Sequence, residues 1–249
     1  MKKFRTLALA LTATAVLASP AMAAGKPSAD HAIAPEAMVG DYPAPADFDE
    51  AKKAEVSAAN QQKMNAIGIE ANPIIVLDPG HGGSDPGAVG NGLYEKNLTL
   101  DIALRTKSYM DANYPATTYL TRSTDTYLTL DQRTSFANSR GASFFVSMHI
   151  NSYSTSTPNG LEVYHYPGVS DGQSLATNVY NKLKPSFSTL RGVKTAEFYV
   201  LKYTYMAAAL GETGFISNPT DASKLGSATF RQQLAQQYAA GMHVYWWGW

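Results

Sequence analysis

Short apolar runs alternate with longer segments of helical periodicity over residues 73–246. The run PIIVLD at 73–78 is continuously apolar and leads into Pro-Gly, as expected of a buried strand. Comparable runs predict further strands at 117–121, 143–149, 160–166, 197–201 and 205–212. Apolar residues recurring three or four positions apart predict helices at 94–112, 130–139, 171–184 and about 230–246.

This alternation of strands and helices is typical of a single α/β domain with a mostly parallel sheet flanked by helices. In such sheets, ligands bind beyond the carboxyl ends of the strands. Three acidic or imidazole side chains come at the ends of predicted strands: Asp78, His149 and Glu212. We therefore expect a functional site on one rim of the sheet.

The amino-terminal pattern differs from the rest. Lys2, Lys3 and Arg5 precede an apolar stretch at 7–17, and Ala21-Met22-Ala23 offers small residues for cleavage. The stretch is too short to span a bilayer, which takes about 20 apolar residues. Residues 1–23 are thus predicted to be a signal peptide, and the mature chain is expected to be exported (to the periplasm, cell wall or exterior) without an integral membrane segment.

Residues 24–71 are rich in Ala and Pro and are predicted to be a linker, with a possible helix at 49–66 that has no strong apolar stripe. The catalytic domain is predicted to occupy residues 72–249.

Composition limits the kinds of functional site that the chain can contain. The chain of 249 residues has a formal net charge of +0 and no run of like charges, so nothing indicates a nucleic-acid surface. It contains no Cys, which excludes disulfides, thiolate zinc sites and cysteine nucleophiles. Any metal must be held by carboxylates and by the five histidines, which are His31, His81, His149, His165 and His243.

Four polar segments are candidates for the site. The loop DPGHGGSDPG (78–87) surrounds His81 with glycines, but it lacks the spacing and the Lys of a phosphate-binding loop. Glu95 begins a predicted helix, where complementing the helix dipole would explain it equally well. His149 in SMHIN, taken alone, could be a structural histidine. Glu212 lies between glycines after an apolar stretch, which is unusual for a surface charge.

Taken together, these residues suit zinc. A catalytic zinc ion typically has three protein ligands, and two His with one Glu is a known set, which His81, Glu95 and His149 could supply. Glu212 would then be the separate carboxylate that accepts a proton from the attacking water. The residues themselves indicate a metal-assisted hydrolase and do not identify its substrate.

The segments carrying these residues resemble the zinc-dependent N-acetylmuramoyl-L-alanine amidases of the amidase-3 family. The matching stretches are LDPGHGGSDPGAVGNGLYEKNLTLDIALR (77–105), TRSTDTYLTLDQRTSFAN (121–138), SMHIN (147–151), RGVKTAEFYVL (191–201) and GETGFISNP (211–219). The resemblance implies a six-stranded sheet, Zn²⁺ on His81, Glu95 and His149, and Glu212 as the catalytic glutamate. It also implies hydrolysis of the amide between N-acetylmuramic acid and L-alanine in peptidoglycan.

Some members of this family carry an inhibitory helix after the second His, which a partner protein displaces. Only 153–159 separate Asn151 from Gly160 here, so we expect no such helix and an enzyme that needs no activator. Two alternatives stay open: a zinc peptidase that cuts the stem peptide, and a non-catalytic wall-binding protein.

Other polar residues are expected to have structural roles. His165 is expected on a strand face, His243 at a packing interface, and the Trp tail at 246–249 in the core or at an interface. Asp78 could orient His81 or cap a turn, and Asn151 and Arg133 could contact substrate or hold loops.

Overall fold

A computed structural model describes residues 43–65 and 72–249. The predicted signal peptide, and residues 24–42 and 66–71 of the predicted linker, lie outside the described residues. Within the described part, no helix is both long and apolar enough to cross a membrane. The remaining linker residues contain helix α1 (Glu50–Asn65), close to the predicted bounds.

Residues 43–65 pack against the domain. The ring of Phe48 meets that of Tyr203 edge-on, with centroids 4.9 Å apart. Nζ of Lys53 donates to the carbonyl of Lys202, and Nδ2 of Asn60 donates to the carbonyl of Ser143 at 3.1 Å. Helix α1 is therefore held by specific contacts on the surface of the sheet domain, although its sequence has no apolar stripe.

The main sheet has six strands in the order β4-β1-β5-β8-β6-β7. Their bounds are β1 (Ile74–Pro79), β4 (Thr117–Leu120), β5 (Phe144–Asn151), β6 (Leu161–His165), β7 (Leu190–Thr195) and β8 (Ala207–Phe215). All neighbouring pairs are parallel except β6 and β8, which are antiparallel. The predicted α/β class and mostly parallel six-stranded sheet are confirmed.

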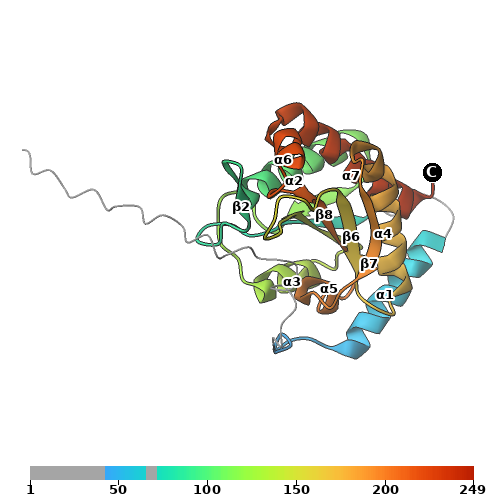
Figure 1. The fold of residues 1–249 in the computed structure, drawn as a ribbon. Coiled ribbons are helices and arrows are strands. Elements are labelled where there is room, and N and C mark those ends of the chain that lie inside the picture. Colours follow the sequence, from blue (N-terminus) through green and yellow to red (C-terminus); the bar gives the residue numbers. More distant parts are fainter. Residues whose placement is uncertain (1–42, 66–71) are drawn as a thin grey trace, which may run out of the picture. The chain divides into compact units, whose positions relative to one another are not determined.

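Helices cover both faces of this sheet (Figure 1). On one face, α2 (Glu95–Asn113), α4 (Ser170–Leu183) and α7 (Ala228–Trp247) enclose the larger core, which includes Ile102, Leu175 and Leu234. The other face carries α3 (Leu130–Ser139) and α5 (Tyr199–Lys202), with Phe48 and Val56 packed on the smaller core.

Two predicted elements differ from the structure. The strand expected at 197–201 is wrong: its apolar side chains Phe198, Val200 and Leu201 are buried by the short helix α5. The sixth strand is instead β7, a mostly polar edge strand with no buried residue, so the sequence carries no hydrophobic signal for it. Helix α6 (Pro219–Gly226), capped by the Asn218 side chain, was not anticipated.

A small hairpin was also not anticipated. It joins β2 (Val89–Gly90) and β3 (Leu93–Tyr94). The Asn91-Gly92 turn has φ values of 49° and 77°, the left-handed pair that an Asn-Gly turn favours. The turn signal was therefore present in the sequence. This hairpin leads the chain directly into Glu95, the first residue of α2.

The alternation of side chains along each strand determines which of them can meet. In β5, Phe144 and Val146 belong to the larger core and Phe145 to the smaller one, so the side chain of His149 lies on the α3/α5 face. His149 is the register partner of Glu212, which is in turn the partner of Glu162 on β6. One row of three polar side chains therefore crosses this face of the sheet.

Candidate metal centre

The site begins where β1 ends, at the loop that carries His81. Two buried arginines hold this loop through its carbonyls. Arg122 donates to the carbonyls of Pro79 at 2.9 Å and Gly80 at 2.8 Å, and Arg133 donates to those of Pro79 at 2.9 Å and His81 at 2.8 Å. Of the two roles considered for Arg133, the structure shows loop holding. Arg122 was assigned no role from the sequence.

Three predicted ligands converge at the end of this loop. Oε1 of Glu95 lies 3.1 Å from Nε2 of His81 and 3.0 Å from Nδ1 of His149. One ligand atom from each of these buried residues lies within 4.8 Å of the other two. The structure thus brings together His81 from the loop after β1, Glu95 from the start of α2, and His149 from β5.

Backbone groups fix the Glu95 carboxylate. Its Oε1 accepts from the N–H of Ile150 at 2.9 Å, and its Oε2 accepts from the N–H of Ala88 at 2.8 Å. Only 2% of the residue is exposed. A side chain that merely complemented the helix dipole would face solvent, so this alternative does not describe Glu95.

Asp85 orients His81. Its Oδ2 lies 2.8 Å from Nδ1 of His81, which leaves Nε2 facing Glu95. This arrangement, with a carboxylate on the outer nitrogen of the imidazole, is common around metal-bound histidines. Of the two roles considered for Asp78, which were orienting His81 and capping a turn, the first is wrong, because Asp85 occupies this position. The spacing of four residues between His81 and Asp85 was the available signal.

Asp78 instead pairs with Arg133 beneath the loop. Its Oδ1 accepts from Arg133 at 2.7 Å and from Thr121 at 2.6 Å, while Oδ2 accepts from Ser147 at 2.8 Å. Both members of the ion pair are buried. The pair connects β1, β5 and α3 directly below the candidate ligands.

Charge and burial set the protonation of the three candidate ligands. Burial alone would lower the pKa of His81, but the charge of Glu95 and the bond to Asp85 outweigh it and raise that pKa to about 10. Burial would raise the pKa of Glu95, yet the two imidazoles drive it below its usual range. Burial, together with the charge of His81, lowers the pKa of His149. Without a metal, an imidazolium and a carboxylate therefore compensate each other here.

Gly80 and Gly87 let the rings approach the backbone. A Cβ on Gly80 would lie 2.2 Å from Cε1 of His149, and one on Gly87 would lie 2.6 Å from Cδ2 of His81 and 2.7 Å from Oε2 of Glu95. These contacts are shorter than real Cβ contacts, so a side chain at either position would displace a candidate ligand.

Glu212 lies beside the trio on the next strand. It is 1% exposed, and burial, followed by the charge of Glu95, raises its pKa well above the ordinary value. Its Oε2 is buried without a hydrogen-bond partner among the described residues. A buried, unpaired carboxyl oxygen is costly for folding, and such groups commonly have a functional explanation.

The described residues fit a bound cation. Nε2 of His81 is also buried without a hydrogen-bond partner, although it points at Glu95. Two imidazoles and one carboxylate are ligands that zinc prefers, and three protein ligands leave a position open. His81, Glu95 and His149 could therefore hold a metal ion.

A cavity of about 410 Å³ opens beside His81 and His149. Its walls come from the loop before α3, from α3 and from the start of α5; apolar side chains such as Leu128 and Phe198 cover most of them, and Asp131 and Arg133 add charged groups. The cavity is therefore largely apolar next to two of the three candidate ligands.

The remaining histidines and the Trp tail lie elsewhere. A Cβ added to Gly172 in α4 would lie 3.6 Å from Cβ of His165, so His165 is on the opposite face of the sheet from the site. His243 stacks on Tyr114, with ring centroids 4.4 Å apart. Trp246 is buried in the larger core as expected, whereas Trp249 is 71% exposed.

Known amidases are similar to this chain in sequence. LytC of Bacillus subtilis, an N-acetylmuramoyl-L-alanine amidase, is 42% identical over 190 residues, which are 75% of this chain and 37% of LytC. A sporulation-specific amidase of the same organism is 43% identical over 171 residues, or 68% of this chain and 66% of the relative. The chain therefore spans less than two thirds of either relative.

A solved amidase structure is similar to this chain in fold as well as in sequence. The catalytic domain of CwlV, an N-acetylmuramoyl-L-alanine amidase from Bacillus (Paenibacillus) polymyxa, superposes with a TM-score of 0.67 at 36% identity, covering 70% of this chain and 97% of that domain. A family model described as N-acetylmuramoyl-L-alanine amidase matches residues 75–244. That range contains all four predicted site residues, and the chain belongs to this amidase family.

Proposed function

We propose that the chain hydrolyses the amide between N-acetylmuramic acid and L-alanine in peptidoglycan, using a zinc ion on His81, Glu95 and His149 and a proton-transferring carboxyl on Glu212. The observation that carries this proposal is the convergence of three buried ligand atoms within 4.8 Å of one another. Family membership supports the choice of bond.

When bound, a zinc ion would polarise the amide carbonyl and make water more acidic. The protein supplies the geometry for this chemistry. Asp85 fixes the ring of His81, two backbone N–H groups fix Glu95, and Gly80 makes room for His149. Because ligands held in this way need not reorganise, the site is prepared for binding before the ion arrives.

Glu212 is suited to move the proton. General base catalysis works best when the pKa of the group lies near the working pH, and burial beside Glu95 raises the pKa of this carboxyl. Its oxygen Oε2 is occupied by no other donor among the described residues. Glu212 would accept a proton from the attacking water and deliver it to the nitrogen of the departing L-alanine.

Export is part of the proposal. Relatives in the comparison are named as cell wall amidases, and peptidoglycan lies outside the cytoplasmic membrane. We infer that residues 1–23 direct the chain to that compartment and that 72–249 form the catalytic domain.

The test is release of soluble peptide from purified peptidoglycan by the zinc-loaded protein, by Glu212→Gln, and by Glu197→Gln, which changes a carboxylate that is 58% exposed. We expect release by the wild type and by Glu197→Gln, and loss of release in Glu212→Gln and after chelation. Full activity in Glu212→Gln would reject its role, and no release by the wild type would favour a wall-binding protein.

A further inference from the structure

A second charged cluster lies on the same face of the sheet as the candidate metal centre. The Glu162 carboxylate on β6 is almost completely buried and accepts hydrogen bonds from three side chains: Tyr164, Arg191 and Lys194. The bond from Lys194 measures 2.8 Å. None of these four residues belongs to the proposed catalytic machinery.

The register of the strands connects this cluster to the site. His149, Glu212 and Glu162 are successive partners across β5, β8 and β6, so their side chains lie in one row. The next strand, β7, is the edge of the sheet. The row thus leads from a candidate metal ligand, through the candidate proton acceptor, to the two cations.

A β-bulge directs Arg191 into this row. Leu161 pairs with Leu190, but Glu162 pairs with Gly192, so Arg191 is the extra residue on β7. Gly192 has a φ of 94°, a backbone angle that residues with a side chain rarely adopt. Bulges redirect side chains next to active sites. Here the bulge brings the guanidinium to Glu162 and also over the ring of Phe215, 5.1 Å from its centroid.

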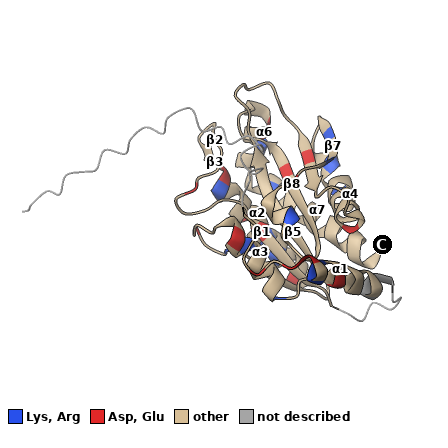
Figure 2. Cartoon of the chain, turned by 90° about the horizontal axis from the view of Figure 1, so that it is seen from below, with Lys and Arg blue, Asp and Glu red and all other residues tan. Residues whose placement is uncertain are grey.

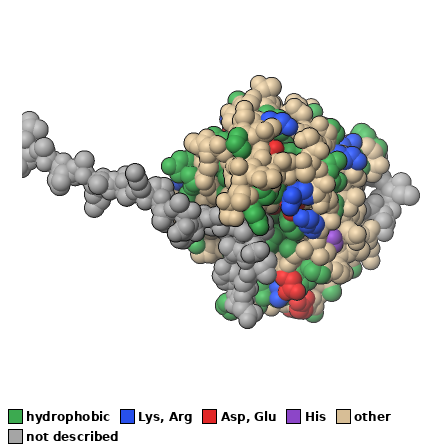
Figure 3. All heavy atoms as spheres, in the orientation of Figure 1, with side chains coloured by type: hydrophobic (Ala, Val, Ile, Leu, Met, Phe, Trp, Pro, Cys, Tyr) green, Lys and Arg blue, Asp and Glu red, His purple; other side chains and the backbone are tan. Residues whose placement is uncertain are grey.

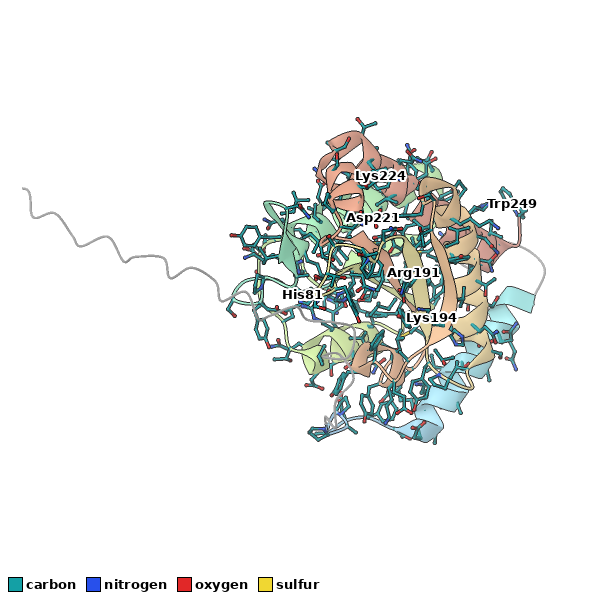
Figure 4. The ribbon with its side chains drawn as sticks, in the orientation of Figure 1. His81, Arg191, Lys194, Asp221, Lys224 and Trp249 are labelled. Atoms are coloured by element: carbon teal, nitrogen blue, oxygen red, sulfur yellow. The ribbon has the colours of Figure 1, made fainter. Side chains whose placement is uncertain are left out.

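The cluster carries an excess positive charge that faces solvent. Lys194 and Arg191 share one carboxylate, so one positive charge is left over, and their side chains are 38% and 36% exposed. Figure 2 shows blue bands on β7 and red bands on other strands of the same sheet. Arg191 and Lys194 lie along β7 in Figure 4, and Figure 3 shows basic side chains exposed in the middle of that face.

We propose that Arg191 and Lys194 form a subsite that binds a carboxylate on the peptide portion of the substrate, with Glu162 positioning both cations. The inference rests on the proposed amidase function. Arg191 bonds to Glu162 through Nε, and its two terminal nitrogens donate to no other group among the described residues, so they can bind a carboxylate in a bidentate manner.

The assignment to the peptide follows from chemistry on either side of the amide. The lactyl carboxyl is consumed in the scissile amide and the N-acetyl sugar is uncharged, so that side offers no anion. The largely apolar cavity beside His81 and His149 suits it better. A stem peptide can carry free carboxylates, and it would extend from Glu212 towards β7.

Strand spacing indicates which peptide residue is bound. Neighbouring strands lie about 4.8 Å apart, so β7 is roughly 10 Å from β8. An extended peptide advances about 3.4 Å per residue, and the long side chains of Arg and Lys reach back towards the site. The carboxylate is thus expected on the second or third residue after the scissile amide.

The experiment compares two soluble muramoyl peptides that differ only by a carboxylate or a carboxamide on the second residue, and a second pair that differs in the same way on the third. Each is tested with the zinc-loaded wild type, Lys194→Gln, Arg191→Lys and Lys184→Gln. Lys184 is an exposed lysine in the 3-10 turn 184–186 and serves as the matched control.

For one of the two pairs we expect the wild type and Lys184→Gln to prefer the carboxylate by about tenfold in kcat/KM. The preference should come mainly from a lower KM. A tenfold preference corresponds to about the free energy of one charge-assisted hydrogen bond. Lys194→Gln should lose most of the preference, which is a ratio between paired substrates and so does not depend on the overall activity of the variant. Arg191→Lys keeps the charge but not the bidentate geometry, and it should lose part of the preference.

Removal of one cation leaves the other on Glu162, so folding is checked by the melting temperature of each variant. If one variant unfolds, the other folded variant decides the assignment to Arg191 and Lys194, and a preference equal to that of the wild type in a folded variant would overturn it. Equal kcat/KM within both pairs would overturn the subsite but leave the amidase function intact. Hydrolysis of none of the substrates by the wild type would reject the proposed function itself, and the subsite with it.

Discussion

Glu212 and His149 face each other in register on the neighbouring strands β8 and β5, with their side chains on the same face of the sheet. The next register pair along β5 and β8 joins Asn151 to Phe215, so β8 contains one extra residue just after Glu212. This bulge ends regular pairing at the point where the candidate chemistry begins. The proposed proton-transferring carboxyl and the candidate metal-binding imidazole are therefore fixed relative to each other by the backbone of the sheet.

Replacing Glu212 by Gln should reduce catalysis but should not destabilise the fold. We expect activity to fall by about 10² to 10⁴, the usual contribution of a general base. Because burial raises the pKa of this carboxyl, its ionised form destabilises the fold. In metal-free protein, the wild type should lose stability relative to Glu212→Gln as pH rises above the ordinary carboxyl value of 4.5. Denaturant unfolding of both proteins across pH 4 to 8 measures this. A difference in unfolding free energy that stays the same across this pH range would contradict it.

Metal binding should release a proton. The pKa of His81 is about 10 without metal, so this ring is protonated at neutral pH and must lose its proton to become a ligand. Because the pKa of His149 is lowered, this ring is neutral at pH 7 and releases no proton when the metal binds. We expect about one proton released per zinc ion at pH 7, measured by calorimetry in buffers of different ionisation enthalpy. Zinc affinity should increase with pH up to about 10, and a pH-independent affinity would reject this assignment.

The buried pair of Asp78 and Arg133 should be costly to break. Asp78→Ala leaves Arg133 buried without its counter-ion, which typically costs about 3–5 kcal/mol. The exposed pair of Lys107 and Asp111 is a matched comparison, and Asp111→Ala should cost no more than about 1 kcal/mol. Urea denaturation measures the loss of unfolding free energy in each variant. Equal losses in the two variants would show that Asp78 contributes no more than a surface charge does.

Gly80→Ala should weaken metal binding because its Cβ would overlap the ring of His149. A disturbance just outside the ligand shell commonly reduces metal affinity about 10- to 100-fold. Gly226→Ala is the control, because nothing lies within 4 Å of a Cβ there. Competition with a chromogenic zinc chelator compares them, and equal affinities would show that the ring can move aside freely.

The connection between β5 and β6 contains no helix in the described residues, as the sequence predicted from the short spacing between Asn151 and Gly160. We therefore expect full activity from the purified chain alone. Initial rates on peptidoglycan, with and without a soluble extract of the source cell envelope, measure this. A large and saturable increase with the extract would contradict it.

Most of the sheet could be predicted from sequence because β1, β5 and β8 are buried and read as continuous apolar runs. β7 could not, since it is an exposed and polar edge strand. The apolar run at 197–201 was misassigned because a short helix can bury the same side chains as a strand.

The four proposed site residues could be named from sequence because each lies in a motif, but their supporting contacts could not. Asp85 rather than Asp78 orients His81, since the loop turns back within four residues. The role of Arg122 depends on carbonyls more than 40 residues away, which no local pattern indicates. The link between Glu162 and Glu212 exists only through strand pairing.

The bond that is cut tests the central claim most directly. Purified peptidoglycan is digested with the zinc-loaded protein, and both the soluble peptides and the remaining glycan are analysed by mass spectrometry. The account predicts intact stem peptides with a free L-alanine amino terminus, together with glycan whose lactyl groups carry free carboxyls. Peptides cut internally, with L-alanine still attached to the glycan, would contradict it and identify a peptidase.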